Sequence, residues 1–363
     1  MKNKPTLLII SDDIRKDLHG PLSFFYKVQI VHLYRLARYQ DMSKEEFVNT
    51  IAYKDHKHLY KLICKIKPDI IQAPEPWASR AAFFNTFAVI KYHKKYKTPF
   101  IYPMFENLSA QSKFGKILGL FMKWYLGYYS RFATFILALN NGAKRNLLAC
   151  GVSKNKIRRD ILWATWGVDT NQFKPNWTKK TAHPSLFFVG KVEKQKGILN
   201  IIEAYKKLKK QIPNLTLEVA GSGSLVKNVT DLPDVRYLGI VKNKLIHKYF
   251  QKSWITLAPS ISSKNWIEQV GMANIQSIAC GTPVITTTSG AIPEYMPNKI
   301  VGYLVPENNS AKLTYAILRL LDDEKLRINM SRQAYRYALE KYDARKNIQK
   351  AQNFILDITG QNK

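Results

Sequence analysis

The sequence has few cysteines, and it lacks any long apolar run. Its three cysteines, Cys64, Cys150 and Cys280, stand far apart with no metal-ligand spacing, and an odd number is typical of a reducing compartment. No uninterrupted apolar run of about 18 residues occurs, so we expect no membrane-spanning helix. The short apolar run near the amino terminus is followed at once by Asp12 and Asp13. We therefore interpret it as a buried strand and not as a secretory signal.

Acidic residues are also scarce. Against 57 Lys and Arg the 363-residue chain has only 26 Asp and Glu, which gives a net charge of +31. This charge favours anionic partners, whether nucleic acid, anionic lipid or phosphorylated small molecules, and selects none of them. A generally lysine-rich proteome is the alternative explanation. No nucleic-acid-binding module is recognisable, so we expect no specific nucleic-acid partner.

Short apolar runs alternate with longer amphipathic segments along most of the chain. Helical periodicity is clear at 198–211 and 311–342, and strand-like runs lie between such segments. The alternation predicts an α/β protein with parallel, doubly wound sheets. The strand candidates are TLLII (6–10), DIIQA (69–73), PFIYP (99–103), FILAL (135–139), SLFFVG (185–190), LTLEVAG (215–221), WITLAP (254–259) and PVITTT (283–288).

The series of strands restarts after a polar segment with two prolines at 165–185, which we interpret as a linker. We expect two α/β domains, at 1–175 and 182–344, with a helix at about 345–363 packing back on the first. Open α/β sheets bind ligands outside the carboxyl ends of their strands. Two such domains facing each other would hold a ligand in the cleft between them.

The stretch NWIEQVGMANIQSIACGTPVI, at 265–285, combines a loop acid, a glycine and a helix start. Gly271 lets a ligand approach the backbone, and the N–H groups of Met272 and Ala273 would point at it, which suits a phosphate. Glu268 before the helix and Gln276 inside it can then reach polar groups on either side of that phosphate. This spacing fits a nucleotide-sugar; an ordinary helix cap is the alternative.

The stretch LFFVGKVEKQKGILNIIEAY, at 186–205, places two lysines on the loop after a strand. The ammonium groups of Lys191 and Lys196, ahead of Gly197, can neutralise a departing diphosphate. A solvated basic loop is the alternative. After the next strand, Gly221 and Gly223 resemble part of a dinucleotide fingerprint without its third glycine or its acidic residue, so we favour a tight turn.

Together these stretches resemble retaining glycosyltransferases of family four (glycosyl transferases group 1), which have the GT-B fold of two Rossmann-like doubly wound domains. The resemblance covers most of the chain, and it is strongest in the second half, the donor domain. In the family's order, the matching pieces there are FFVGKVEKQKGILNIIEAY, LTLEVAGSG, VRYLGIV, APSIS, WIEQVGMANIQSIACGTPVI, SGAIPE and VGYLVP. The first half is matched more loosely through KPDIIQAPEP, PFIYPMFENL, ALNNGAKRNLLACGV and WGVDTNQFKP.

The resemblance assigns roles to four of these residues and shows two departures from the family. Glu268 matches the first acid of an E-x7-E pattern, which contacts the donor sugar. Gln276 replaces the second acid, which binds the ribose hydroxyls, so we expect weaker or altered nucleotide binding. Lys191 occupies the position of the phosphate-binding arginine without its bidentate fork, and Lys196 matches the family lysine. A degenerate, non-catalytic member is the alternative.

In the first half the resemblance assigns less. The amino-terminal glycine pair of the family has only His19-Gly20-Pro21 as a counterpart, and we carry no role over to it. Where many members have a histidine near the reacting sugar, this chain has Glu106-Asn107. Glu106 is our candidate for a polar group facing the cleft; a loop carboxylate that offsets nearby lysines is the alternative.

The resemblance implies transfer on one face of the sugar, in which the departing phosphate oxygen helps to deprotonate the acceptor. Catalysis then rests on positioning and charge stabilisation, and the nucleotide-sugar is a substrate. We expect no cofactor and no metal, because basic side chains and a helix N-terminus replace it. No Asp-x-Asp stands at a strand end, and His56-x-His58 lies in a lysine-rich helical stretch that we interpret as a solvated face.

The segment KFGKILGLFMKWYLGYYSRFATFILAL, at 113–139, predicts a helix followed by a buried strand. The helix has more aromatic residues than one buried face needs, with Lys116, Lys123 and Arg131 among them, which suits an interfacial helix on anionic lipid. A core helix is the alternative. The resemblance implies a lipid-linked or glycan acceptor in cell-surface polysaccharide or glycolipid synthesis. We therefore expect a cytoplasmic enzyme, peripheral on the inner face of the cell membrane.

Overall fold

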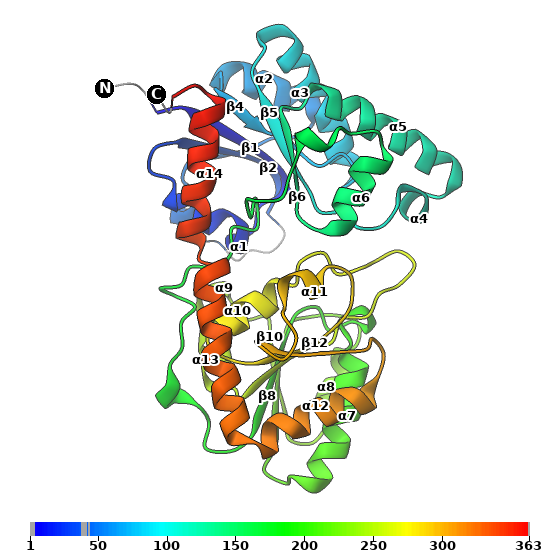
Figure 1. The fold of residues 1–363 in the computed structure, drawn as a ribbon, viewed down its shortest axis with the longest axis vertical. Coiled ribbons are helices and arrows are strands. Elements are labelled where there is room, and N and C mark those ends of the chain that lie inside the picture. Colours follow the sequence, from blue (N-terminus) through cyan, green and yellow to red (C-terminus); the bar gives the residue numbers. More distant parts are fainter. Residues whose placement is uncertain (1–3, 38–41, 43, 362–363) are drawn as a thin grey trace. The chain divides into compact units, whose positions relative to one another are not determined.

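The computed structural model describes residues 4–37, 42 and 44–361, which form two compact units (Figure 1). The first unit is Met1–Trp166 with Ala344–Lys363, and the second is Gly167–Asp343. The boundary between the units, after Trp166, therefore lies ahead of both expected bounds, which were 175 for the end of the first domain and 182 for the start of the second. The Val168 N–H donates to the carbonyl of Tyr342 at 2.8 Å, and the Gln251 amide donates to the carbonyl of Lys174 at 2.7 Å. These bonds tie the segment after Trp166 to the second unit.

The first unit is built on a seven-stranded parallel sheet in the order β3-β2-β1-β4-β5-β6-β7. Its central strands are runs of apolar residues because helices cover both faces of a parallel sheet. The direction of winding reverses between β1 and β4, where open α/β sheets bind ligands at the carboxyl edge. The strands are β1 (Thr6–Asp13), β2 (Gln29–Leu36), β3 (Thr50–Ala52), β4 (Ile70–Gln72), β5 (Phe100–Met104), β6 (Phe135–Ala138) and β7 (Ile157–Arg158).

Successive residues of β1 enter different cores. Leu8 packs in the cluster beneath α2, α3, α5 and α6, whereas Leu7 and Ile9 pack with α14 and η1. Across the described residues, no helix is both long enough and apolar enough to cross a bilayer. The helices of this unit are α1 (Lys16–His19), η1 (Gly20–Phe24), η2 (Lys44–Phe47), α2 (His56–Ile66), α3 (Arg80–Tyr96), α4 (Ala110–Phe114), α5 (Lys116–Phe132), α6 (Asn141–Ala149), η3 (Lys154–Lys156) and α14 (Ala344–Ile358).

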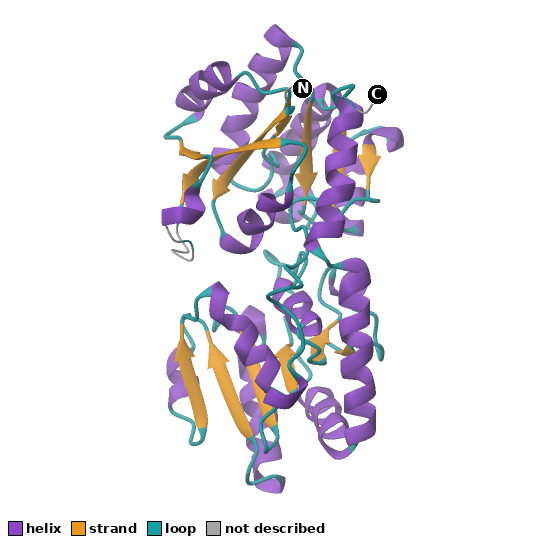
Figure 2. Cartoon of the chain, turned by 90° about the vertical axis from the view of Figure 1, so that its left-hand side faces the viewer, coloured by secondary structure: helices purple, strands orange, loops and turns teal. Residues whose placement is uncertain are grey.

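The second unit is built on a six-stranded parallel sheet in the order β10-β9-β8-β11-β12-β13, with helices on both faces (Figure 2). Leu186 and Phe188 of β8 pack beneath α7 and α12, and Phe187 between them packs on Phe250 of α9. The two sheets confirm the predicted doubly wound α/β class. The strands are β8 (Ser185–Val189), β9 (Thr216–Ala220), β10 (Val235–Gly239), β11 (Ile255–Ala258), β12 (Val284–Thr287) and β13 (Gly302–Val305).

The helical pattern at 311–342 forms two helices, because the Asp323 carboxylate caps a new helix by accepting from the Leu326 N–H at 2.8 Å. The helices of the second unit are η4 (Trp177–Lys179), η5 (Lys194–Lys196), α7 (Ile198–Gln211), α8 (Val226–Thr230), α9 (Asn243–Lys252), α10 (Met272–Ala279), α11 (Ile292–Tyr295), α12 (Ser310–Asp322) and α13 (Glu324–Lys341).

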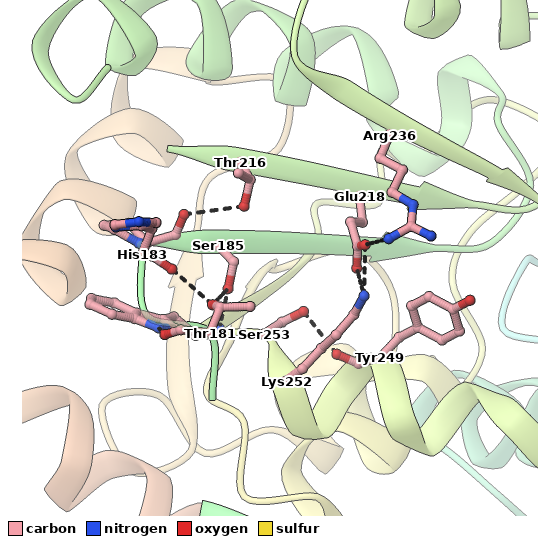
Figure 3. A network of polar contacts seen from close by, with 11 residues as sticks. Thr181, His183, Ser185, Thr216, Glu218, Arg236, Tyr249, Lys252 and Ser253 are labelled. Atoms are coloured by element: carbon pink, nitrogen blue, oxygen red, sulfur yellow. Dashed lines mark hydrogen bonds and ion pairs between the residues drawn. The ribbon is translucent and has the colours of Figure 1, made fainter. Parts of the chain in front are cut away.

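Polar contacts fix the amino ends of β8 and β11 and the middle of β9 (Figure 3). The hydroxyls of Thr181 and Ser185 lie 2.7 Å apart. Glu218 of β9 lies between Lys252 and Arg236, at 2.7 and 3.3 Å. Because its carboxylate is mostly buried, these two cations compensate its desolvation. The contacts at the strand starts anchor the edge opposite the loops described next.

Candidate functional site

The carboxyl ends of β8 and β11 bring two loops into backbone contact. Gly197 ends the first loop with φ +72°, and a Cβ there would lie 2.0 Å from the carbonyl oxygen of Pro259. The Ile261 N–H donates to the carbonyl of Gln195 at 2.8 Å. Only glycine permits both this left-handed conformation and this approach. The glycine after the two lysines therefore locks their loop onto the loop that leads to Glu268.

Lys196 and Glu268, both predicted from the sequence, form the centre of this site. The Lys196 ammonium lies 2.6 Å from Oε2 of Glu268, and the Ser260 hydroxyl donates to the same oxygen at 2.8 Å. Lys196 also lies over the ring of Trp266, 4.6 Å from its centroid. The Ala291 N–H holds the backbone carbonyl of Glu268 at 3.0 Å. The site thus presents one fixed carboxylate and one fixed ammonium side by side.

Lys191 lies on the same loop, exposed to solvent. Nearby, the Glu193 carboxylate accepts from the Ser224 N–H at 2.8 Å and the Ser224 hydroxyl at 2.6 Å. These bonds, with the charge of Lys191, lower the pKa of Glu193. Gly223 explains the approach of the two loops, since a Cβ there would lie 2.3 Å from the carbonyl oxygen of Val192. The glycines after β9 therefore serve loop packing, as the favoured turn interpretation requires.

Helix α10 begins as the sequence predicted. Gly271 is its N-cap at φ +76°, and Met272 and Ala273 form its first turn. Gln276 lies one turn further along and is 8% exposed. Asn274, which sequence reasoning missed, is 1% exposed, and its Oδ1 has no hydrogen-bond partner within the described part of the chain. One buried polar atom with unused bonding capacity, Oδ1 of Asn274, therefore lies near the start of this helix.

Sequence reasoning also missed an acidic residue after β13. The Glu307 carboxylate accepts from the N–H of Ser262 and, at 2.9 Å, from its hydroxyl. The same hydroxyl lies 2.8 Å from that of Ser289. Both serines stand in segments that carried the resemblance, APSIS and SGAIPE, which was the available signal. Glu307 fixes the loop after β11, so the ends of β8, β11, β12 and β13 all support the site.

Glu106 belongs to the first unit and lies after β5. It is 4% exposed; its carboxylate accepts from the Leu108 N–H at 2.9 Å and forms an ion pair with Lys113. This geometry matches the alternative in which the carboxylate offsets a nearby lysine. Glu75, which the sequence analysis missed, accepts from the backbone N–H groups of Phe105 and Glu106 at 2.9 and 3.1 Å. Burial raises the pKa of Glu75 to about 7.

No group of three or more histidine, cysteine and acidic side chains is arranged to hold a metal ion in the described ranges. His56 and His58 lie in the first turn of α2, where the Nδ1 of His58 accepts from the Lys54 N–H at 3.2 Å. The lysine side chains of the site are cationic, and the backbone N–H groups at the start of α10 add partial positive charge.

Two parallel α/β sheets, with a final helix that returns to the first unit, define the GT-B class of fold. The crystal structure of HepE of Anabaena in complex with UDP and glucose is similar, with a TM-score of 0.76 at 15% identity over 97% of this chain and 100% of that chain. Sucrose-phosphate synthase of Thermosynechococcus elongatus has a TM-score of 0.72 at 16% identity, over 98% of this chain and 100% of that chain. At these identities the likeness shows the fold alone.

Residues 169–337 match the sequence model of the family described as glycosyl transferases group 1. Over these residues the match bears out the resemblance drawn from the motifs. The amylovoran biosynthesis glycosyltransferase AmsK of Erwinia amylovora is 25% identical over 198 residues, which are 52% of this chain and 48% of that protein. Poly(glycerol-phosphate) alpha-glucosyltransferase of Bacillus subtilis is 26% identical over 167 residues, which are 42% of this chain and 23% of that protein. The matched regions thus span about half, or less, of these curated relatives.

Proposed function

We propose that this protein is a retaining glycosyltransferase that moves a hexose-type sugar from a nucleotide-sugar to a lipid-linked or glycan acceptor. The observation that carries the proposal is the contact of Lys196 with Glu268 beside the start of α10. A nucleotide-sugar has an anionic diphosphate between two hydroxylated groups. A carboxylate, an ammonium and a helix N-terminus in one place complement that charge pattern.

When the donor binds, Lys196 and Glu268 give up their contact with each other and each contacts the donor instead. The diphosphate takes the Lys196 ammonium, with Lys191 as a second cation, and the N–H groups of Met272 and Ala273 assist at the helix end. The Glu268 carboxylate then accepts hydrogen bonds from the sugar hydroxyls. Stabilising the charge that develops on the departing diphosphate is the catalytic contribution of the lysines.

The nucleotide side of the site is formed by Gln276. Its amide can bond two ribose hydroxyls but without the strength of a carboxylate. HepE is described in complexes with UDP and with UDP-glucose, which makes UDP-sugars the first donors to test here. No metal is required in this scheme, because the lysines and the helix N-terminus supply the positive charge.

Retention is supported by family membership and by the product of a relative. The Bacillus subtilis relative is named for an alpha-linked product, and an α-linked donor gives such a product when configuration is kept. The amylovoran relative is named for the synthesis of a polysaccharide. We place the present chain in cell-surface polysaccharide or glycolipid synthesis on the same grounds.

A membrane surface is part of the proposal because α5 is apolar on two sides. Met122, Tyr125 and Leu126 face the core of the first unit. At positions i, i+3, i+4 and i+7 the helix presents an outward apolar face that is unusual for a surface helix. We call this the α5 patch: Ile117, Leu120, Phe121 and Trp124, which are 88%, 61%, 45% and 62% exposed.

Basic side chains lie on the same helix as the α5 patch, and their charge favours an anionic surface as its partner. Lys116 and Lys123 lie on the same helix, in a chain of net charge +31. Apolar side chains beside lysines complement a bilayer with anionic headgroups. We propose that this helix docks the protein on the cytoplasmic leaflet, where a lipid-linked acceptor is found.

The experiment that tests the proposal is thermal stabilisation by UDP-, GDP-, ADP-, CDP- and dTDP-sugars, followed by donor turnover. One nucleotide-sugar should raise the Tm of the wild type, less so for Glu268→Ala, and should release free nucleotide. Stabilisation without turnover across many acceptors would favour the second candidate, a non-catalytic binding protein, which the replacement of the usual acid by Gln276 makes worth testing. No stabilisation by any donor would refute donor binding.

A further inference from the structure

A chain of three polar side chains in the first unit lies outside the site described above. Ser11 is on β1, His32 on β2 and His19 at the end of α1. The Ser11 hydroxyl lies 2.8 Å from Nε2 of His32, and the Nδ1 atoms of His32 and His19 lie 2.9 Å apart. The two imidazole rings are stacked, with centroids 5.1 Å apart. Each ring therefore holds the other in place.

Both imidazoles are neutral near pH 7. Burial and the charge of Lys16 lower the pKa of His19 to about 4, and burial together with His19 lowers that of His32 to about 3. Two neutral rings in Nδ1–Nδ1 contact share a single proton between them. Since Nδ1 of His19 is used by His32, its Nε2 is the nitrogen left for another partner.

His19 lines a cavity of about 380 Å³ that lies wholly within the first unit. Leu22, Ile30 and Val48 supply apolar wall, and Ser23 and Asn49 supply polar groups. Lys16 and Glu46 also line it, and they form an ion pair with each other. With the charges paired and the histidines neutral, the cavity has no net charge.

We propose that this cavity binds a neutral, hydroxyl-rich ligand, a sugar residue of the acceptor, and that Nε2 of His19 hydrogen-bonds one of its hydroxyls. His32 and Ser11 are positioning residues that fix the ring and the tautomer of His19. A sugar ring has an apolar C–H face and a rim of hydroxyls, which matches the apolar wall and the polar groups. The volume falls in the range of small-molecule sites. The proposal rests on the proposed glycosyltransferase function.

The first test follows the histidine nitrogens by NMR in the 15N-labelled full chain. We would add glucose, galactose, mannose and N-acetylglucosamine in turn, with inorganic phosphate as the charged control. One sugar should shift the Nε2 resonance of His19, and phosphate should not. If phosphate bound and no sugar did, the assignment to a neutral ligand would be overturned. If neither phosphate nor any sugar shifted the Nε2 resonance of His19, the site itself would be overturned.

A matched pair of substitutions separates the two nitrogens. The amide of His19→Asn lies near the position of Nδ1, so it keeps the contact with His32 and loses the ligand contact. His19→Gln places an amide near the position of Nε2 and retains more of the binding. Sugar affinity should fall about fivefold in His19→Asn, the worth of one hydrogen bond, and less in His19→Gln. Equal losses in both would overturn the role of Nε2.

The role of His32 needs a readout that simple misfolding would not give. His32→Gln should keep the wild-type fold and change the tautomer of His19, seen in its two-bond 1H–15N couplings. His58→Gln, on α2 of the same unit, is the matched control and should leave His19 unchanged. An unaltered His19 tautomer in His32→Gln would show that His32 does not position it.

Turnover distinguishes a failure of this inference from a failure of the proposed function. Hydrolysis of the donor by water in the wild type tests the proposed function alone, whereas transfer to a sugar acceptor by His19→Asn should show a raised KM. No donor hydrolysis by the wild type would count against the proposed function and leave the NMR result standing. An unchanged acceptor KM in His19→Asn would overturn the acceptor site alone.

Discussion

The ammonium of Lys196 lies 2.6 Å from a carboxylate oxygen of Glu268, although the two residues are 72 positions apart in the chain. The ammonium and the carboxylate satisfy each other, so the residue proposed to bind phosphate also holds the residue proposed to bind sugar. Removal of one partner should therefore affect two ligands differently.

Glu268→Ala and Lys196→Ala should have opposite effects on free UDP. Lys196→Ala should weaken UDP about tenfold, because a charge-assisted bond to phosphate is lost. Glu268→Ala should leave UDP unchanged or bound more tightly, since the competing carboxylate is gone, and should weaken UDP-sugar. Isothermal titration with UDP and UDP-glucose checks both. Weaker UDP binding in Glu268→Ala would contradict the exchange of partners.

Gln276→Glu should destabilise the free protein and strengthen donor binding. The side chain is 8% exposed, so a carboxylate there is desolvated, at a cost of about 1–3 kcal/mol. The same carboxylate bonds ribose hydroxyls more strongly than an amide does. The Tm without ligand should fall, and the rise in Tm with nucleotide-sugar should exceed that of the wild type. Gln276→Leu is the control, with a weaker donor response. A response equal to that of the wild type would separate Gln276 from the ribose.

Gly197→Ala should destabilise the second unit by roughly 3 kcal/mol, which combines left-handed strain with overpacking. Its Cβ would lie 2.0 Å from the carbonyl oxygen of Pro259. Gly239→Ala is the matched control, because φ is +64° there and nothing lies within 4 Å. That variant should lose only about 1 kcal/mol. Urea unfolding measures both, and equal losses would exclude the contact with Pro259 as the cause.

Glu75 should make stability depend on pH. Its pKa rises from the usual 4.5 to about 7 on folding, so the folded state holds the proton more tightly than the unfolded state. The contribution of Glu75 to the free energy of unfolding is then fully present below about pH 4.5 and is lost as the pH rises through 7. Glu75→Gln does not ionise, so relative to the wild type it should gain on the order of 3 kcal/mol between pH 4.5 and pH 8.

The control for this pH dependence is Glu324→Gln, whose side chain is 75% exposed. Its stability relative to the wild type should stay nearly flat over the same range. Urea unfolding at pH 5, 6, 7 and 8 gives both curves. A flat curve for Glu75→Gln would mean that Glu75 is ionised in the folded protein at pH 5.

The α5 patch should bind anionic vesicles. Flotation with phosphatidylglycerol vesicles should carry the wild type upward, and phosphatidylcholine vesicles should carry far less. Replacing Ile117 and Trp124 by serine should reduce flotation more than tenfold with little effect on Tm, since both are exposed. Tyr315→Ser and Ile328→Ser, exposed residues of the second unit, are the controls. If the control variants and the patch variants float alike, the helix is not the docking surface. The same follows if flotation depends on the salt concentration but not on these substitutions.

The strands that were recognised in the sequence differ physically from those that were missed. β8 and β11 are buried runs of apolar residues, which stand out as continuous hydrophobic segments. The missed strands lie at an edge of their sheets or next to one, and each is partly exposed: β2, β3, β7, β10 and β13. Half-buried strands in such positions have no single periodicity, so composition alone could not find them.

The sequence by itself determined the alternation of strands and helices, the two sheets, and the loops that carry Lys196 and Glu268. Local chemistry suffices for these features, since glycines at Gly197 and Gly271 and apolar periodicity act over a few residues. The tertiary structure alone decided which polar groups meet: Lys196 with Glu268, Ser262 with Glu307 and His19 with His32. Those contacts join residues 13, 45 and 72 positions apart in the chain, and they follow from the order and register of the strands. That order is set by the packing of the whole core, which no short stretch of sequence contains.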